Sequence, residues 1–145
     1  MADATLGAAG HAKEIVRSLD ESGTYIGFDA DREAVEMARM TLKDAKPKVI
    51  LVNDNFRRMG AALAREGVPQ IDAALFDLGW RAEQLMPERG FSFQHEGPLR
   101  MTYAKDLEPE TLTAHEIVNT WDELSIADVI YGWGEERFAK RIAKA

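Results

Sequence analysis

Short apolar runs alternate with helical patterns in the first half of the chain. Three runs are almost continuously apolar, as expected for strands buried on both faces of a sheet; they span residues 24–29, 49–53 and 73–78. Between them apolar residues recur every three or four positions, which predicts helices at about residues 12–19, 31–43 and 56–66. In the second helix one apolar stripe is predicted, formed by Ala34, Met37, Ala38 and Leu42. Strands separated by helices predict an α/β fold with a mostly parallel sheet and ligands at the carboxyl ends of its strands.

The pattern changes after residue 79. Residues 79–110 contain glycines and prolines without sustained periodicity, which predicts a long loop or lid. Thr113 and Glu116 then fit a capping box, which opens a helix through about Thr120. Two further helices are predicted, one from about residue 122 to 131, broken by Gly132 and Gly134, and one from about residue 135.

The composition limits the classes of protein that fit. A chain of 145 residues, of which 46% are hydrophobic, can form one globular domain with a core. It has no apolar run of about 18 residues that would cross a membrane and no signal peptide, so no membrane partner and a cytoplasmic location are expected. The absence of cysteine excludes disulfides, thiolate zinc sites and thiol nucleophiles. The net charge of −7 argues against a protein that coats nucleic acid.

The segment Asp3–His11, read DATLGAAGH, forms a small glycine-containing turn between a strand and a helix. Gly7 and Gly10 let the backbone approach a ligand closely, and the N-terminus of the following helix offers unpaired N–H groups. Asp29 ends the next strand, where a carboxylate can accept hydrogen bonds from both hydroxyls of a ribose. This pattern predicts a nucleoside site but suits a dinucleotide in a dehydrogenase almost as well.

Polar residues gather at the predicted carboxyl ends of the strands: Asp3, Asp29, Asn53, Asp54 and Asp77. A different kind of cluster closes the chain, where cations recur at helical spacing and share one face: Arg137, Lys140, Arg141 and Lys144. Two interpretations of these cations stay open. They form a local nucleic-acid contact, or they are a solvated helix face favoured by the helix dipole.

The stretch from Asp77 is more specific than any glycine turn. It reads FDLGWRAEQLMPERGFSFQHEGPLRMTYAKD and is followed by GWGEERFAKRIAKA. Together with DATLGAAGH and NDNF, it resembles the bacterial 16S rRNA cytosine-N4 methyltransferases of the MraW/RsmH family, in the family's order and over almost the whole chain. The resemblance implies a Rossmann-like methyltransferase core with an inserted helical domain and S-adenosylmethionine as methyl donor.

The resemblance also implies which residues bind the donor. Ala9, Gly10 and His11, with the glycine turn, match the segment that holds the methionine end. Asp29 matches the residue on the ribose hydroxyls, and Phe56 matches an aromatic beside the adenine. The remaining donor-pocket positions are Asp3, Gly7, Asn55, Asp77 and Gln84.

Several features depart from the family pattern. Ala8 and Ala9 interrupt a run of glycines, and Gly79-Trp80-Arg81-Ala82 replaces two serines that follow the DLG triplet. Relative to the family, most of the first strand and the closing strands are missing, so the chain is expected to be a fragment or a reduced form. The expected domains are a methyltransferase core over residues 1–86 and a lid loop with a partial, helical insert domain over residues 87–145.

Methyl transfer to an exocyclic amine needs a group that positions the amine and accepts its hydrogen bonds. Asp77, at the end of the fourth strand, is the predicted catalytic residue. The absence of cysteine agrees with amine methylation, because methylation at pyrimidine carbon 5 ordinarily uses a cysteine nucleophile. Predicted substrate contacts come from aromatic and basic side chains: Trp80, Phe93, Arg137 and Arg141. Phe91 is predicted to pin the loop to the core, and no metal site is expected.

Three hypotheses follow. The leading one is S-adenosylmethionine-dependent methylation of a cytidine N4 amine in 16S rRNA of the small ribosomal subunit. The second is a catalytically incomplete fragment that binds S-adenosylmethionine or rRNA without turnover, with a homodimer as one source of the missing strands. The third is a nicotinamide-dependent oxidoreductase, supported only by Gly7, Gly10 and Asp29.

Overall fold

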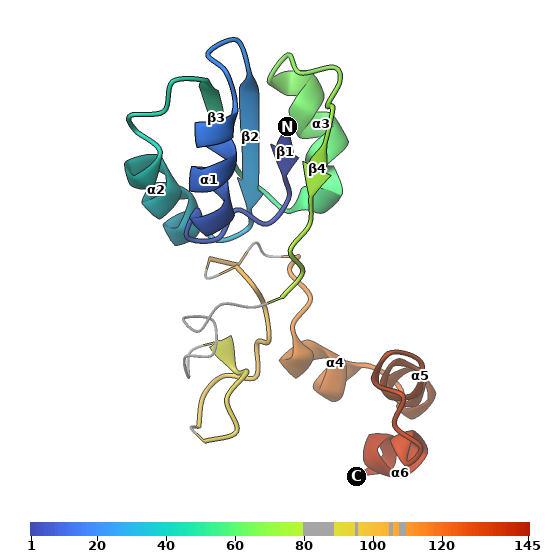
Figure 1. The fold of residues 1–145 in the computed structure, drawn as a ribbon. Helices are drawn as coiled ribbons and strands as arrows, with labels where there is room; N and C mark the ends of the chain where they lie inside the picture. Colours follow the sequence, from blue (N-terminus) through green and yellow to red (C-terminus); the bar gives the residue numbers. More distant parts are fainter. Residues whose placement is uncertain (80–88, 95, 105, 108–109) are drawn as a thin grey trace. The chain divides into compact units, whose positions relative to one another are not determined.

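The computed structural model describes residues 1–79, 89–94, 96–104, 106–107 and 110–145. The chain divides into two compact units (Figure 1). Unit 1 comprises Met1–Ala82 and Tyr103–Asp106, and unit 2 comprises Glu83–Thr102 and Leu107–Ala145. The domain boundary predicted between residues 86 and 87 lies outside the described residues.

Unit 1 contains a parallel sheet of four strands in the order β3-β2-β1-β4. The strands are β1 (Ala2–Asp3), β2 (Thr24–Asp29), β3 (Lys48–Asn53) and β4 (Ala74–Leu75). The two-residue strand β1 lies in the centre and pairs in parallel with both β2 and β4. The predicted α/β fold with a parallel sheet is therefore confirmed.

Two details of the predicted strands are wrong. The fourth strand ends at Leu75 instead of residue 78, because its partner among the described strands is the equally short β1 and the ladder stops at the pair Asp3 and Leu75. The run at 49–53 is not buried on both faces, since β3 is an edge strand and only its Val52 is buried. Apolar sequence alone does not distinguish an edge position from a central one.

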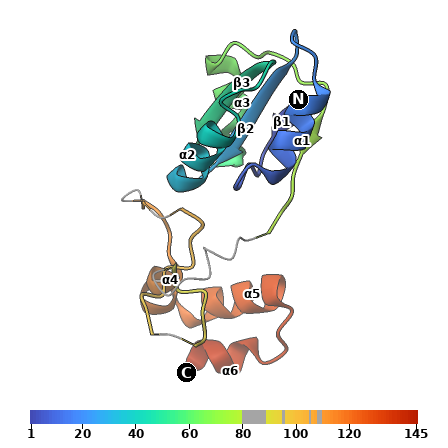
Figure 2. The same ribbon diagram turned by 60° about the vertical axis from the view of Figure 1, so that its left-hand side comes forward.

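Helices cover both faces of the sheet (Figures 1 and 2). On one face, α1 (Gly10–Ser18) and α2 (Arg32–Thr41) form a core with Tyr25 of β2. On the other face, the 3-10 turn η1 (Phe56–Arg58) leads into α3 (Met59–Arg65), which packs near Ile26 and Phe28. Neighbouring residues of β2 thus face opposite layers, as the pleat of a strand requires.

The buried stripe of α2 differs from the prediction at one position. Ala34, Ala38 and Leu42 are buried as expected, but the Met37 side chain is 44% exposed and Val35 is buried instead. Both positions flank the line through Ala34 and Ala38 on a helix, so the spacing permits either. Packing against the sheet selects Val35.

Unit 2 contains the three short helices α4 (Ala114–Thr120), α5 (Glu123–Gly134) and α6 (Ala139–Lys144). The Thr113–Glu116 capping box is present at the start of α4, as predicted. Gly132 does not break α5, which continues to Gly134 and ends at Glu135 with a positive φ of 52°. The last helix therefore begins at Ala139 and not near residue 135.

The motifs ERGFSF and GPL lie against each other in unit 2. The Arg89 carbonyl accepts from the Met101 N–H at 2.7 Å. Gly90 has a φ of +75°, and a Cβ at this position would meet the Pro98 carbonyl and lie 2.9 Å from the Arg100 nitrogen. Only glycine fits here, because the conformation and the close backbone both exclude a side chain.

Candidate functional site

The carboxyl ends of the four strands bring the predicted polar residues to one edge of the sheet. Asp3, Asp29 and Asn53 end β1, β2 and β3, and Asp77 lies two residues beyond β4. The Asn53 side-chain amide donates to the Asp29 carbonyl at 2.9 Å. The topology thus gathers residues that are far apart in the sequence, as predicted from the alternation of strands and helices.

Asp29 holds the glycine turn in place. Its Oδ2 accepts from the Gly7 N–H at 2.9 Å, and its Oδ1 accepts from the Asp31 N–H at 2.8 Å. Gly7 has a positive φ of 52°, a conformation that favours glycine. Each carboxylate oxygen has a second lone pair, so Asp29 can still accept hydrogen bonds from a ligand.

The N-terminus of α1 follows the turn without a side-chain cap. Ala9 occupies the N-cap position in the left-handed region, with φ 66°, and its methyl group has no acceptor for the first N–H groups of the helix. The Ala9 side chain is buried in the core beside Leu6 and Tyr25. The first turn of α1 therefore offers polar N–H groups at the edge where the strands end.

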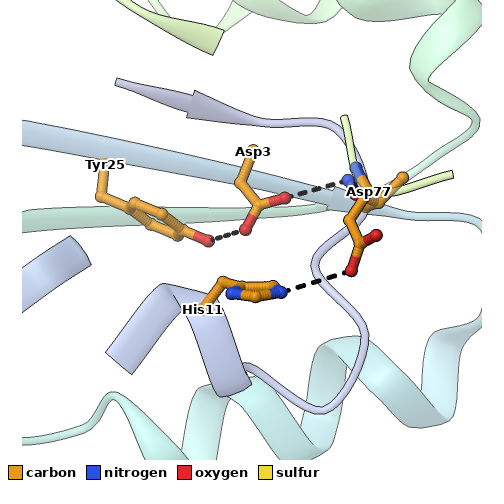
Figure 3. A network of polar contacts seen from close by, with 5 residues as sticks. Asp3, His11, Tyr25 and Asp77 are labelled. Carbon is orange, nitrogen blue, oxygen red and sulfur yellow. Dashed lines mark hydrogen bonds and ion pairs between the residues drawn. The ribbon is translucent and has the colours of Figure 1, made fainter. Parts of the chain in front are cut away.

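His11 and Asp77 meet at this edge (Figure 3). The His11 Nε2 lies 3.3 Å from the Asp77 Oδ2, and the two side chains are 68% and 65% exposed. The Asp77 N–H donates to the Thr5 hydroxyl at 2.8 Å. A solvent-accessible carboxylate can accept a hydrogen bond from a reacting group. The imidazole next to it can share the resulting change in charge through its own hydrogen bond to the carboxylate.

Asp3 is buried beneath the turn. Its Oδ2 accepts from the Tyr25 hydroxyl at 2.6 Å, and its Oδ1 accepts from the Thr5 N–H at 3.0 Å. Burial, with this hydrogen bond to Asp3, raises the pKa of Tyr25 well above its usual value, so the phenol stays a neutral donor. Asp3 supports the turn from below, and its predicted contact with a ligand stays a prediction.

The segment after β3 carries the aromatic Phe56. Its ring, 38% exposed, meets the ring of Phe76 edge-to-face with centroids 5.7 Å apart. Asn55 uses its side-chain oxygen to accept from the Arg57 N–H, so the side chain caps η1. Phe76 was not among the predicted site residues, because its partner lies 20 positions away and only the fold brings the two rings together.

Asp54 carries a perturbed carboxyl beside this segment. Desolvation acts to raise its pKa, but hydrogen bonds from the Arg58 guanidinium and the Asn55 N–H outweigh it, so the pKa of Asp54 lies below its ordinary 3.8. The Arg58 Nε lies 2.6 Å from Asp54 Oδ1. This carboxylate is held by protein donors, unlike the exposed carboxylate of Asp77.

The other predicted site residues lie either outside the described residues or in unit 2. Trp80 and Gln84 lie outside the described residues. In unit 2, the Phe93 side chain is fully exposed, whereas Phe91 is half-buried. The guanidinium carbons of Arg137 and Arg141 lie 4.6 and 5.7 Å from the centre of the Phe138 ring.

Sequence reasoning missed two residues that organise the site, Thr5 and Tyr25. A tyrosine in an otherwise apolar strand was the available signal, since a buried hydroxyl needs a hydrogen-bond partner. Its partner, however, depends on the neighbouring strand. The parallel pairing of β1 and β2 is what places Asp3 beside Tyr25.

The described part of the chain shows neither a metal-binding cluster nor a membrane-spanning helix. Within it, no group of three or more histidine, aspartate and glutamate side chains is arranged to hold a metal ion. Nor does that part contain a helix long and apolar enough to cross a membrane.

The sequence is similar to a known protein family and to a curated relative. The sequence matches the MraW methylase family over residues 1–145. It is also 42% identical to "Ribosomal RNA small subunit methyltransferase H" of Paenibacillus sp. (strain JDR-2), over 149 aligned positions that cover 98% of the chain. The chain spans 46% of the length of that relative.

Proposed function

Because this chain belongs to the MraW methylase family, we propose that it binds S-adenosylmethionine and transfers the methyl group to the N4 amine of a cytidine in 16S rRNA. The observation that carries the proposal is the arrangement at the carboxyl edge. There the Asp29-held glycine turn and the uncapped start of α1 lie beside the exposed pair of His11 and Asp77.

The residues present fit the methyl donor. The free lone pairs of Asp29 suit the two ribose hydroxyls, and the exposed ring of Phe56 suits the flat adenine. The N–H groups of Gly10 and His11 at the start of α1 suit the carboxylate of the methionine end. The bound donor supplies an electrophilic methyl group on a sulfonium sulfur. Gln84, which lies outside the described residues, is proposed as a donor-binding residue on the family resemblance alone.

Asp77 is the proposed catalytic residue. The cytosine amine is a weak nucleophile, because its lone pair is delocalised into the ring, so it must be positioned for in-line attack. On taking the donated methyl group the nitrogen would become positively charged, and it would then give one proton to water at the exposed Asp77 carboxylate. The Asp77 carboxylate accepts hydrogen bonds from the amine and stabilises the positive charge that develops on it. His11 borders this carboxylate at 3.3 Å.

The proposed RNA contacts lie partly in unit 2. Phe93 presents a fully exposed ring on which an unstacked base can stack. Arg137 and Arg141 present guanidinium groups over Phe138, whose ring is 46% exposed. Aromatic rings interleaved with arginines suit single-stranded RNA, and Trp80 is proposed as a further stacking residue.

A second candidate function is binding without turnover. It is favoured by one fact, namely that the chain spans 46% of the length of its curated relative. In this alternative, unit 1 binds S-adenosylmethionine but methyl transfer needs residues or a partner copy, in a homodimer, that the chain alone does not provide.

Calorimetric titration with S-adenosylmethionine tests the proposal, with NAD as the control ligand. We expect saturable binding of S-adenosylmethionine and none of NAD. Radiolabelled methyl transfer to unmodified small ribosomal subunits then separates the two candidate functions. Incorporation supports the enzyme, whereas binding without incorporation supports the second candidate. A folded chain that binds no S-adenosylmethionine contradicts both candidate functions, since methyl transfer and binding without turnover both require a donor site.

Asp77→Ala separates catalysis from binding within this test. The side chain is exposed and is proposed to act on the amine, so turnover should fall by more than donor affinity. Loss of a charged acceptor is worth roughly 1–3 kcal/mol, or about 5- to 160-fold in rate. Equal losses of turnover and affinity would argue against the catalytic role.

A further inference from the structure

A line of polar contacts runs from the core of unit 1 to Asp77 (Figure 3). The Tyr25 hydroxyl donates to Asp3 Oδ2 at 2.6 Å, and the Thr5 N–H donates to Asp3 Oδ1 at 3.0 Å. The Thr5 Oγ1 in turn accepts from the Asp77 N–H at 2.8 Å. The line therefore connects β2 to the segment after β4 by way of β1 and the turn.

The inner end of this line is fixed by burial. Tyr25 is fully buried and Asp3 is 1% exposed. A buried carboxylate needs a donor on each oxygen, since water cannot replace one that is lost. Tyr25 supplies one donor and Thr5 supplies the other, so a shift of Thr5 would leave one oxygen of a buried carboxylate without its donor.

The outer end lies beyond the sheet, where the Phe76 ring also packs against Phe56. The pairing of β4 with β1 ends at Leu75, two residues before Asp77. The Asp77 side chain is 65% exposed and contacts His11 at 3.3 Å. The hydrogen bond to Thr5 thus ties the Asp77 amide directly to the turn after β1.

We propose that Thr5 and Tyr25 are positioning residues for Asp77. The buried pair of Tyr25 and Asp3 fixes the backbone of Thr5, and the Thr5 hydroxyl holds the Asp77 amide, which aims the carboxylate at His11 and the reacting amine. The effect on methyl transfer rests on the proposed function, whereas the brace itself is a property of unit 1.

Amide hydrogen exchange, followed by NMR on the full chain, tests the outer link. Thr5→Val keeps the shape of the side chain but removes the acceptor, and Thr5→Ser keeps the hydroxyl. Exchange of the Asp77 amide should become about 2- to 12-fold faster in Thr5→Val, the range for one hydrogen bond. It should stay near the wild-type rate in Thr5→Ser. Equal exchange in wild type and Thr5→Val would overturn the outer link.

Tyr25→Phe tests the inner link against a control for lost stability. Val16→Ala is the matched control, since Val16 belongs to the same buried cluster as Tyr25 and none of the three hydrogen bonds involves it. Tyr25→Phe should speed exchange of the Asp77 amide and change the His11 ring nitrogen resonances, whereas Val16→Ala should change neither. Similar changes in both variants would show that Tyr25 acts only through general stability.

Donor titration and methyl transfer connect the brace to activity. In a chain that transfers methyl groups, Thr5→Val should lower kcat by about tenfold with less than about a threefold change in KM for the donor, and Thr5→Ser should restore kcat. A change in KM for the donor as large as the fall in kcat would overturn the positioning role. If the wild type binds no S-adenosylmethionine, the proposed function fails, but the exchange rates still decide whether the brace exists.

Discussion

Asp29 has two tasks that the geometry separates. Its side chain accepts main-chain hydrogen bonds from Gly7 and Asp31, and its remaining lone pairs face the proposed ribose position. Removing the carboxylate therefore loosens the turn as well as deleting a ligand contact. Asp77 differs, because its carboxylate is exposed and, among the described residues, lies against the side chain of His11.

Asp29→Ala should lower both stability and donor affinity. We expect S-adenosylmethionine affinity to fall by roughly 1–3 kcal/mol, the value for a charged acceptor, together with a lower Tm. Calorimetry and thermal unfolding measure the two effects. Asp44→Ala, which removes a carboxylate that is 88% exposed, is the control and should change neither. Unchanged affinity in Asp29→Ala would remove this residue from the proposed donor site.

Arg58→Ala should change the acid side of the stability curve. The pKa of Asp54 lies below 3.8 in the folded chain, so its ion pair stabilises the fold above that pH and is lost as pH falls through the lowered pKa. Removing the guanidinium should raise the pKa of Asp54 and cost about 0.5–1 kcal/mol at neutral pH. Wild-type and variant stabilities should converge near pH 3 and below, in thermal unfolding at several pH values. A constant difference would contradict this assignment.

Elements of unit 2 depend on backbone geometry more than on a large core. The residues around Gly90 lie against 98–100, and the start of α4 continues the same contact, since the His115 N–H donates to the Leu99 carbonyl at 2.7 Å. The motif ERGFSF therefore has a structural basis for its glycine, apart from any contact with RNA.

Gly90→Ala and Gly132→Ala should have opposite effects on unit 2. At Gly90 the new methyl group meets backbone atoms at a positive φ, so we expect the free energy of unfolding to fall by at least about 2 kcal/mol. At Gly132, inside α5, a Cβ meets nothing within 4 Å, so alanine should stabilise the helix by about 0.5–1 kcal/mol. Thermal unfolding by circular dichroism measures both. A loss of stability of similar size in Gly90→Ala and Gly132→Ala would refute the explanation from backbone geometry.

The charge of the whole molecule is opposite to what RNA binding requires. With 25 acidic and 18 basic residues, the net charge is −7, so phosphate contacts must be local. The cations of α6 and of the segment before it are the proposed local site. Arg141 lies in α6 and Arg137 directly precedes Phe138, its N-cap.

The double variant Arg137→Ala, Arg141→Ala should weaken binding to a fragment of unmodified 16S rRNA without changing donor affinity. Loss of two phosphate contacts should reduce the slope of log affinity against log salt by roughly 1 to 2. Arg17→Ala with Arg39→Ala makes the same change in net charge on α1 and α2 and should have little effect. Equal weakening in both double variants would place the RNA contact elsewhere.

The sequence by itself determined the fold class, the family resemblance and a set of candidate site residues. Strand β2 and the capping box of α4 were predicted at their observed positions, because a short apolar run and local hydrogen-bonding chemistry act over a few residues. Asp29 and Asp77 were predicted at strand ends for the same reason, since a parallel sheet fixes where its carboxyl ends meet.

Only the tertiary structure decided which side chains support the site from within. The length of β4, the choice of Val35 over Met37 and the continuation of α5 past Gly132 all depend on packing partners distant in sequence. The same holds for Asp3, whose partner Tyr25 is 22 positions away. Local sequence shows that a buried carboxylate and a buried hydroxyl need partners, but the pairing of strands determines which ones they find.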